Sequence, residues 1–143
     1  MKDRMYVEID SNSSNESLAR IIVAAFLTKL NPTASEIEEV KMAVSEAVTN
    51  AVIHGYGEGE GIIYIECFAE NDEFKVSIKD FGIGIVNIAQ ARKPLFTTKE
   101  DEERSGMGFS FMEIFMDNVD VISEPGKGTT VIMKKIIGRD GGD

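Results

Sequence analysis

Apolar positions follow a two-residue period at the start of the chain and a helical period after it. The segment Met5-Tyr-Val-Glu-Ile-Asp10 alternates apolar and polar residues, which predicts a strand. From Leu18 to Leu30 the apolar residues recur at three- and four-residue intervals, as in an amphipathic helix. Asn31-Pro32 ends this helix, because proline cannot continue its hydrogen bonds.

A second helix is predicted to begin at the capping-box sequence Thr33-Ala-Ser-Glu36. The glycine-rich loop 55–61 ends it. Its apolar face is predicted to contain Ile37, Val40, Val44, Ala47, Val48 and Ala51.

Four further strands are predicted in the remaining sequence. Segments 62–69 and 73–80 flank a short turn, and segments 118–123 and 129–137 flank a second one. Residues 109–117 predict a short helix between these hairpins. The long connection 85–107 has little regular pattern, and such loops are usually lids over a site or disordered.

These elements predict an α+β two-layer sandwich. Two hairpins cannot be parallel crossovers, so we expect a mixed, mainly antiparallel sheet with the helices on one face. The length of 143 residues suits one hydrophobic core. We expect a single domain over 1–137, with a lid at about 92–107 and a disordered tail at 138–143.

Composition removes several classes of function. The formal net charge is −10, from 15 basic and 25 acidic residues, which disfavours nucleic-acid binding through phosphates. The single cysteine, Cys67, excludes an intramolecular disulfide and predicts a small buried residue in a strand. There is no leader pattern and no membrane-length apolar run, so we expect a cytoplasmic protein without nucleic-acid or membrane partners.

The second helix carries polar residues beside its apolar stripe. At about 100° per residue, Glu46 and Asn50 lie about 40° apart, and His54 continues the same row. One interpretation is a solvated flank with a histidine near the helix C-terminus. The other is a functional set of side chains at the edge of the core.

Asp80 ends a strand on the side of its apolar residues. In Phe74-Lys-Val-Ser-Ile-Lys-Asp80-Phe-Gly-Ile-Gly84, alternation places Asp80 on the face of Phe74. The carboxylate either accepts N–H bonds from the following turn or recognises an amino group of a ligand. Gly82 and Gly84 would let the backbone approach a flat ligand. Asp80-Phe-Gly82 also spells the magnesium motif of protein kinases, but the other kinase motifs are missing.

A glycine pair precedes the third predicted helix. Ser105-Gly-Met-Gly-Phe109 would offer backbone N–H groups to an anion at a helix start. Thr97, Thr98, Lys99 and Arg104 in the same loop would add hydroxyls and positive charge, or else belong to a solvated charged run. Thr130, at the start of the last strand, is either a further site residue or an ordinary strand former.

In this order the motifs resemble the ATP-binding fold shared by gyrase, the Hsp90 chaperones, histidine kinases and MutL, the GHKL superfamily. The resemblance spans about 46–130. Within the superfamily the chain is most similar to the stand-alone anti-sigma factor serine kinases of sporulation. The compact length and the segments Glu46–His54 and Asp80–Gly84 carry this similarity.

The resemblance implies ATP and Mg²⁺ as ligands and a role for each motif. Asn50 would bind Mg²⁺, and Glu46 would be the general base. Asp80 would accept from the adenine 6-amino group, with Gly82 and Gly84 beside the ring and Thr130 assisting. The other nucleotide contacts would be His54, Thr97, Thr98, Lys99, Arg104, Gly106, Met107, Gly108 and Phe109.

The resemblance also implies partners. The chain would bind and inhibit a sporulation sigma factor, phosphorylate a serine of an anti-anti-sigma factor, and form a homodimer. The edge segment Met5–Ile9 and Arg20 are candidate contacts, which the sequence does not assign. An ATP-dependent binding module without phosphoryl transfer is the main alternative. A histidine kinase domain and an ATP-hydrolysing chaperone module remain further alternatives.

Overall fold

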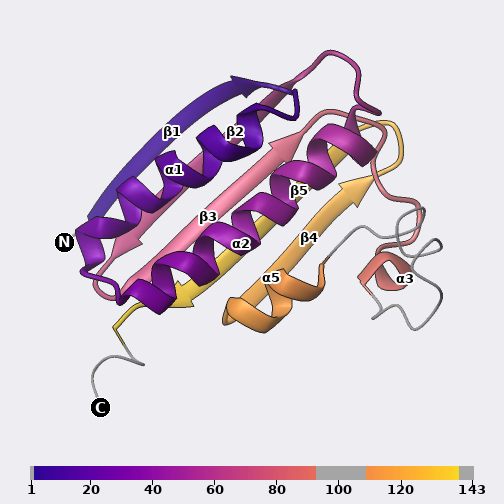
Figure 1. Ribbon diagram of the computed structural model, residues 1–143. Helices are drawn as coiled ribbons and strands as arrows, with labels where there is room; N and C mark the ends of the chain where they lie inside the picture. Colours follow the sequence, from indigo (N-terminus) through magenta and orange to yellow (C-terminus); the bar gives the residue numbers. More distant parts are fainter. Residues whose placement is uncertain (1, 93–108, 139–143) are drawn as a thin grey trace.

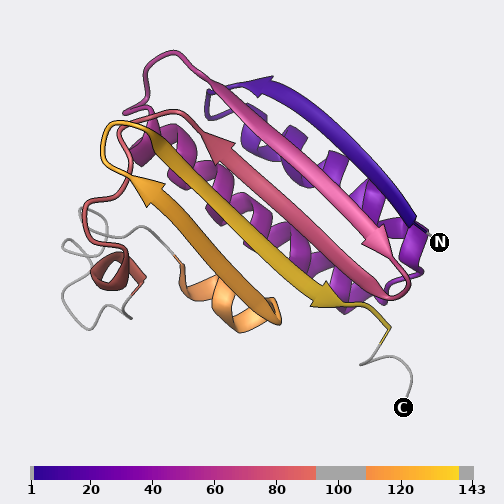
Figure 2. The ribbon, with the colours of Figure 1, turned by 180° about the vertical axis from the view of Figure 1, so that it is seen from behind.

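A five-stranded sheet carries its helices on one face, as the front and back views show (Figures 1 and 2). The computed structural model describes residues 2–92 and 109–138. Its strands are β1 (Lys2–Asp10), β2 (Ile62–Glu70), β3 (Glu73–Asp80), β4 (Asn118–Glu124) and β5 (Gly128–Ile136). Its helices are α1 (Asn15–Leu27), η1 (Thr28–Leu30), α2 (Ala34–Asn50), η2 (Ala51–Gly55), α3 (Ile88–Arg92) and α5 (Ser110–Phe115). The predicted two-layer α+β architecture is confirmed.

The strand order is β1-β2-β3-β5-β4. β5 lies between β3 and β4 because the last hairpin folds back against the middle of the sheet. All four pairings are antiparallel. The described sheet is therefore wholly antiparallel rather than mixed, since the parallel strands β3 and β4 are separated by β5.

The observed boundaries differ from the predicted ones mainly at element ends. β1 begins three residues earlier than predicted, and α1 ends in the 3-10 turn η1 before Asn31, which has a φ of 52°. Helix α3 lies in the long connection, where the sequence pattern predicted no helix. The Asn87 side chain accepts from Gln90 N at 3.0 Å, as an N-cap does, so this asparagine was the available signal for the helix. Apart from Arg92 and Gly138, the predicted lid and tail lie outside the described residues.

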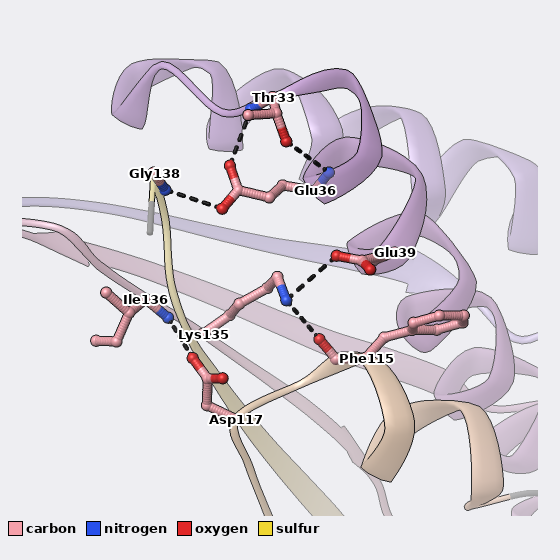
Figure 3. A network of polar contacts seen from close by, with 8 residues as sticks. All are labelled: Thr33, Glu36, Glu39, Phe115, Asp117, Lys135, Ile136 and Gly138. Carbon is pink, nitrogen blue, oxygen red and sulfur yellow. Dashed lines mark hydrogen bonds and ion pairs between the residues drawn. The ribbon is translucent and has the colours of Figure 1, made fainter. Parts of the chain in front are cut away.

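The predicted capping box of α2 is confirmed. Thr33 Oγ1 accepts from Glu36 N at 3.1 Å, and Glu36 Oε1 accepts from Thr33 N at 2.9 Å. Glu36 is fully buried, and its second oxygen accepts from Gly138 N at 2.9 Å (Figure 3). One carboxylate thus joins the start of α2 to the end of the last strand.

The core lies between the sheet and the helices. On α2, the predicted positions Val40, Val44, Ala47 and Val48 are all buried. Cys67 is fully buried in β2, as predicted, and burial raises the pKa of its thiol to about 12. The thiol is therefore protonated near neutral pH and packs as a small apolar group. Within the described residues, no helix is both long and apolar enough to span a membrane.

Candidate functional site

A narrow pocket lies where the C-terminal end of α2 meets the sheet. It contains side chains from α2, η2, β3 and β5, together with the residue before α5. The lining residues are Ala47, Asn50, Ala51, His54, Gly55, Ile78, Asp80, Gly84, Ile85, Phe109, Thr129 and Val131. Five of the predicted site residues, Asn50, His54, Asp80, Gly84 and Phe109, therefore border one pocket.

Asp80 is the last residue of β3 and is only 4% exposed. Its Oδ1 accepts from Gly82 N at 2.9 Å, and the backbone N–H of Thr129 donates to the same carboxylate. Burial raises the pKa of Asp80, and these two hydrogen bonds act in the opposite direction. The turn-cap interpretation is therefore confirmed, and the same carboxylate also borders the pocket.

Glycines allow three backbone segments to meet around Asp80. A Cβ on Gly55 would lie 2.8 Å from the carboxylate, and one on Gly82 would lie 1.9 Å from Gly55 O. A Cβ on Gly84, which has a φ of +78°, would lie 2.1 Å from Glu124 O. Gly82 and Gly84 are thus required by backbone packing, a role that the sequence analysis did not predict for them.

Gly55 lines the pocket, although its place in the sequence indicates only the end of a helix. It belongs to η2, a π-helical turn that continues α2 with hydrogen bonds between residues five apart. This turn brings His54 and Gly55 to the pocket, and Gly55 O accepts from Ile83 N at 2.9 Å. The sequence gives no clear signal for a π-turn, although a glycine directly after the polar row marks the place.

Asn50 is the last residue of α2 and is 9% exposed. Its Nδ2 is buried and has no hydrogen-bond partner among the described residues. A buried amide atom without a partner costs about 1–3 kcal/mol, so such groups usually face a ligand or water. Asn50 is therefore the strongest single indication of a ligand in this pocket.

Glu46 lies on α2, one turn before Asn50, and its side chain contacts the start of α5. Its Oε1 accepts from Met112 N at 3.1 Å, and Phe111 N–H also donates to the carboxylate. Burial raises the pKa of Glu46 to about 7, and the two N–H groups oppose this increase. A carboxylate with this pKa exchanges protons near neutral pH.

Thr130 does not line the pocket. Its Cα partner is Lys79, whereas Thr129 is the partner of Asp80. Because side chains alternate along a strand, Thr129 shares the face of Asp80 and Thr130 points to the other face. The predicted position is thus wrong by one residue. Thr129 is 9% exposed, and its Oγ1 lies 2.8 Å from Ser123 Oγ.

The remaining predicted contacts lie outside the described residues. They are Thr97, Thr98, Lys99, Arg104, Gly106, Met107 and Gly108.

Comparison with known proteins identifies the family of this chain. Residues 10–135 match the family of histidine kinase-like ATPase domains. An anti-sigma F factor of Geobacillus sp. (strain WCH70) is 54% identical over 96% of the chain and 94% of that relative. One of Bacillus cereus (strain G9842) is 53% identical over the same shares. The chain belongs to the anti-sigma F factor family. The predicted resemblance is therefore confirmed.

Solved structures of low identity share the fold. The RsbU and RsbW domains of a Mycobacterium tuberculosis protein match with a TM-score of 0.67 and 18% identity, over 94% of this chain and 32% of that one. The catalytic domain of histidine kinase ThkA matches with a TM-score of 0.58 and 17% identity, over 93% and 96%. These two structural matches support the assignment of the histidine kinase-like fold, and they say nothing about activity.

The raised pKa of Glu46 predicts a pH-dependent cost to stability. Between pH 4.5 and about 7 the folded chain keeps a proton that the unfolded chain releases, so stability falls as the pH rises through this window. Glu46→Gln removes this cost and still offers an oxygen to Met112 N. We expect its free energy of unfolding, relative to the unsubstituted chain, to rise by about 1–2 kcal/mol from pH 5 to pH 8, a value reduced for partial solvent contact.

Urea unfolding at both pH values measures this difference. Glu38→Gln, at an exposed glutamate of the same helix, is the control and should show no such increase. An equal effect of Glu46→Gln at pH 5 and pH 8 would contradict the prediction.

Proposed function

We propose that the chain is an anti-sigma factor and an ATP-dependent protein serine kinase. It would bind and inhibit a sporulation sigma factor, and it would phosphorylate a serine of the anti-anti-sigma antagonist. The observation that carries this proposal is that Asn50 and Asp80 border one pocket, with Glu46 one turn before Asn50. The names of the curated relatives support the sigma-factor partner.

The adenine of ATP would bind at the Asp80 end of the pocket. The buried carboxylate would accept a hydrogen bond from the 6-amino group. Ile78, Ile85 and Val131 supply apolar walls for the ring. Thr129, rather than Thr130, places a hydroxyl beside Asp80 and would assist this recognition.

The residues present also fit a magnesium ion. The Asn50 atom that lacks a partner among the described residues is Nδ2, a donor, and exchange of the amide oxygen and nitrogen positions would present Oδ1 to a cation in the same place. Mg²⁺ is commonly held by one or two protein oxygens together with phosphates and waters. When bound, the ion would neutralise phosphate charge.

Glu46 would serve as the general base. The serine Oγ would attack the γ-phosphorus and form a new O–P bond, while the bond from phosphorus to the β–γ bridging oxygen breaks and ADP leaves with the electron pair. The hydroxyl proton would pass to the Glu46 carboxylate. Glu46 and Asn50 are about 6 Å apart along the helix axis, so both can serve one phosphoryl group.

A homodimer is also part of the proposal. β1 is an edge strand, paired only with β2 in the described sheet. Two copies of β1 paired antiparallel about Tyr6 would place Lys2 opposite Asp10 and Arg4 opposite Glu8. These opposite charges would favour the pairing.

Asp80→Asn tests the adenine assignment. The new amide replaces one acceptor oxygen with a donor, so we expect ATP to bind about tenfold or more weakly by calorimetry, with GTP affinity unchanged or raised. Asp72→Asn, in the turn after β2, is the matched control. Unchanged ATP affinity in folded Asp80→Asn would leave Asp80 as a turn cap alone.

Incubation with γ-labelled ATP tests the phosphoryl transfer. We expect label on a serine of the anti-anti-sigma partner, and we expect Glu46→Gln to lose at least about 100-fold in rate while its ATP affinity stays within about twofold. Capture from sporulating-cell extract should retain the sigma factor.

Other results would favour the alternatives. Label on histidine indicates a histidine kinase, free phosphate alone indicates an ATP-hydrolysing module, and ATP binding without any transfer indicates a binding module. Full phosphorylation by Glu46→Gln would remove Glu46 from the base role.

A further inference from the structure

Helix α5 is held at both ends by side chains that connect it to α2. At its start, Met112 N donates to Glu46 Oε1 at 3.1 Å. At its end, Lys135 Nζ donates to Phe115 O at 2.6 Å and lies 3.3 Å from Glu39 Oε1 (Figure 3). Glu39 and Glu46 both belong to α2, so one helix holds both ends of the other.

Lys135 is an unusual residue for its position. It lies on the core face of β5 in register with Phe74, and it is 6% exposed. A buried ammonium is costly unless it is paired, and here a carboxylate and a carbonyl oxygen supply the partners. An apolar residue would fill this place without such partners, so the charge points to a specific task.

The spacing of Glu39 and Glu46 along α2 is close to the length of α5. Glu39 and Glu46 are seven residues apart, or about 10.5 Å along α2, and the six residues of α5 span about 9 Å. The charges also follow the helix dipole, with a carboxylate at the N-terminus and an ammonium at the C-terminus.

A helix this short does not hold its own conformation in water, because nucleation costs more than one turn of hydrogen bonds returns. Tertiary contacts must therefore keep α5 in place. Asp117, two residues after the end of α5, adds a contact by accepting from Ile136 N at 2.7 Å (Figure 3). Release of the C-terminal contacts would loosen the N-terminal ones as well.

We propose that Lys135 is a positioning residue for phosphoryl transfer: it fixes α5 so that the N–H groups of Phe111 and Met112 hold the Glu46 carboxylate in its reactive orientation. This inference rests on the proposed function of Glu46 as the base. Lys135 acts only through α5 and touches no reacting atom.

Lys135→Met tests the proposal, because methionine fills a similar volume without the charge. We expect kcat for phosphorylation to fall about tenfold or more, as in other cases of small displacements of catalytic groups, with the Kd for ATP within twofold. Lys135→Arg should restore most of the rate. Lys134→Met, whose side chain lies on the opposite face of β5, should behave like the unsubstituted chain.

Two further readouts separate positioning from a general loss of stability. Amide hydrogen exchange of Phe111 and Met112 should accelerate in Lys135→Met while that of Val76 in the sheet does not. The pKa of Glu46 is raised by burial and lowered by the N–H groups of Met112 and Phe111. Loss of those N–H bonds should therefore move the acid limb of the pH–kcat profile to higher pH.

If Lys135→Met does not fold, Glu39→Gln weakens the same contact and should produce the same changes to a smaller degree. Unchanged exchange at Met112 in a folded variant overturns the proposal, and so does an equal loss of kcat in Lys134→Met. The exchange measurement needs no activity, so it still reports on this contact if the unsubstituted chain transfers no phosphate and the proposed function fails.

Discussion

The site depends on a backbone contact between two glycines. Gly55 O accepts from Ile83 N at 2.9 Å, and Gly82 packs so closely on Gly55 that a Cβ there would lie 1.9 Å from the carbonyl oxygen. This contact joins the end of the long helix to the end of the central strand. It therefore helps to fix where Asn50 and Asp80 lie relative to each other in the lining of the pocket. No side-chain contact could bring the segments so close.

The hydrophobic pattern predicted the sheet and the main helices, because burial on one face requires the periods of two and 3.6 residues. It did not predict the contacts that complete the site. The hydrogen bond of Glu46 to Met112 joins residues 66 positions apart, and no local pattern shows such a pairing. The error at Thr130 has a similar cause. Both threonines fit the start of a strand, and only the register with β3 decides which one faces Asp80.

Buried polar groups in this molecule fall into two kinds. Glu36 and Lys135 each satisfy their charged atoms, with at least one partner from another element, and they join the helices to the last strand. Among the described residues, Asn50 Nδ2 lacks such a partner, and Asp80 accepts from backbone N–H groups of its own turn and the adjacent strand. Since buried polar groups are normally satisfied, the unpartnered Asn50 amide in the pocket lining indicates a ligand, whereas Asp80 belongs to the site through its place in the same lining. Residue type alone would not separate them.

Glu46 combines features of both kinds. Burial beside the core would make its carboxylate a weak acid, whereas the N–H groups at the start of α5 favour the ionised form. The balance places the pKa at about 7, where the group can accept a proton and later release it. Neither α2 nor α5 produces this balance alone, because α2 supplies the carboxylate and α5 supplies the donors. The reactivity of the proposed base is thus a property of how two helices pack, and any residue that fixes their packing also affects the chemistry.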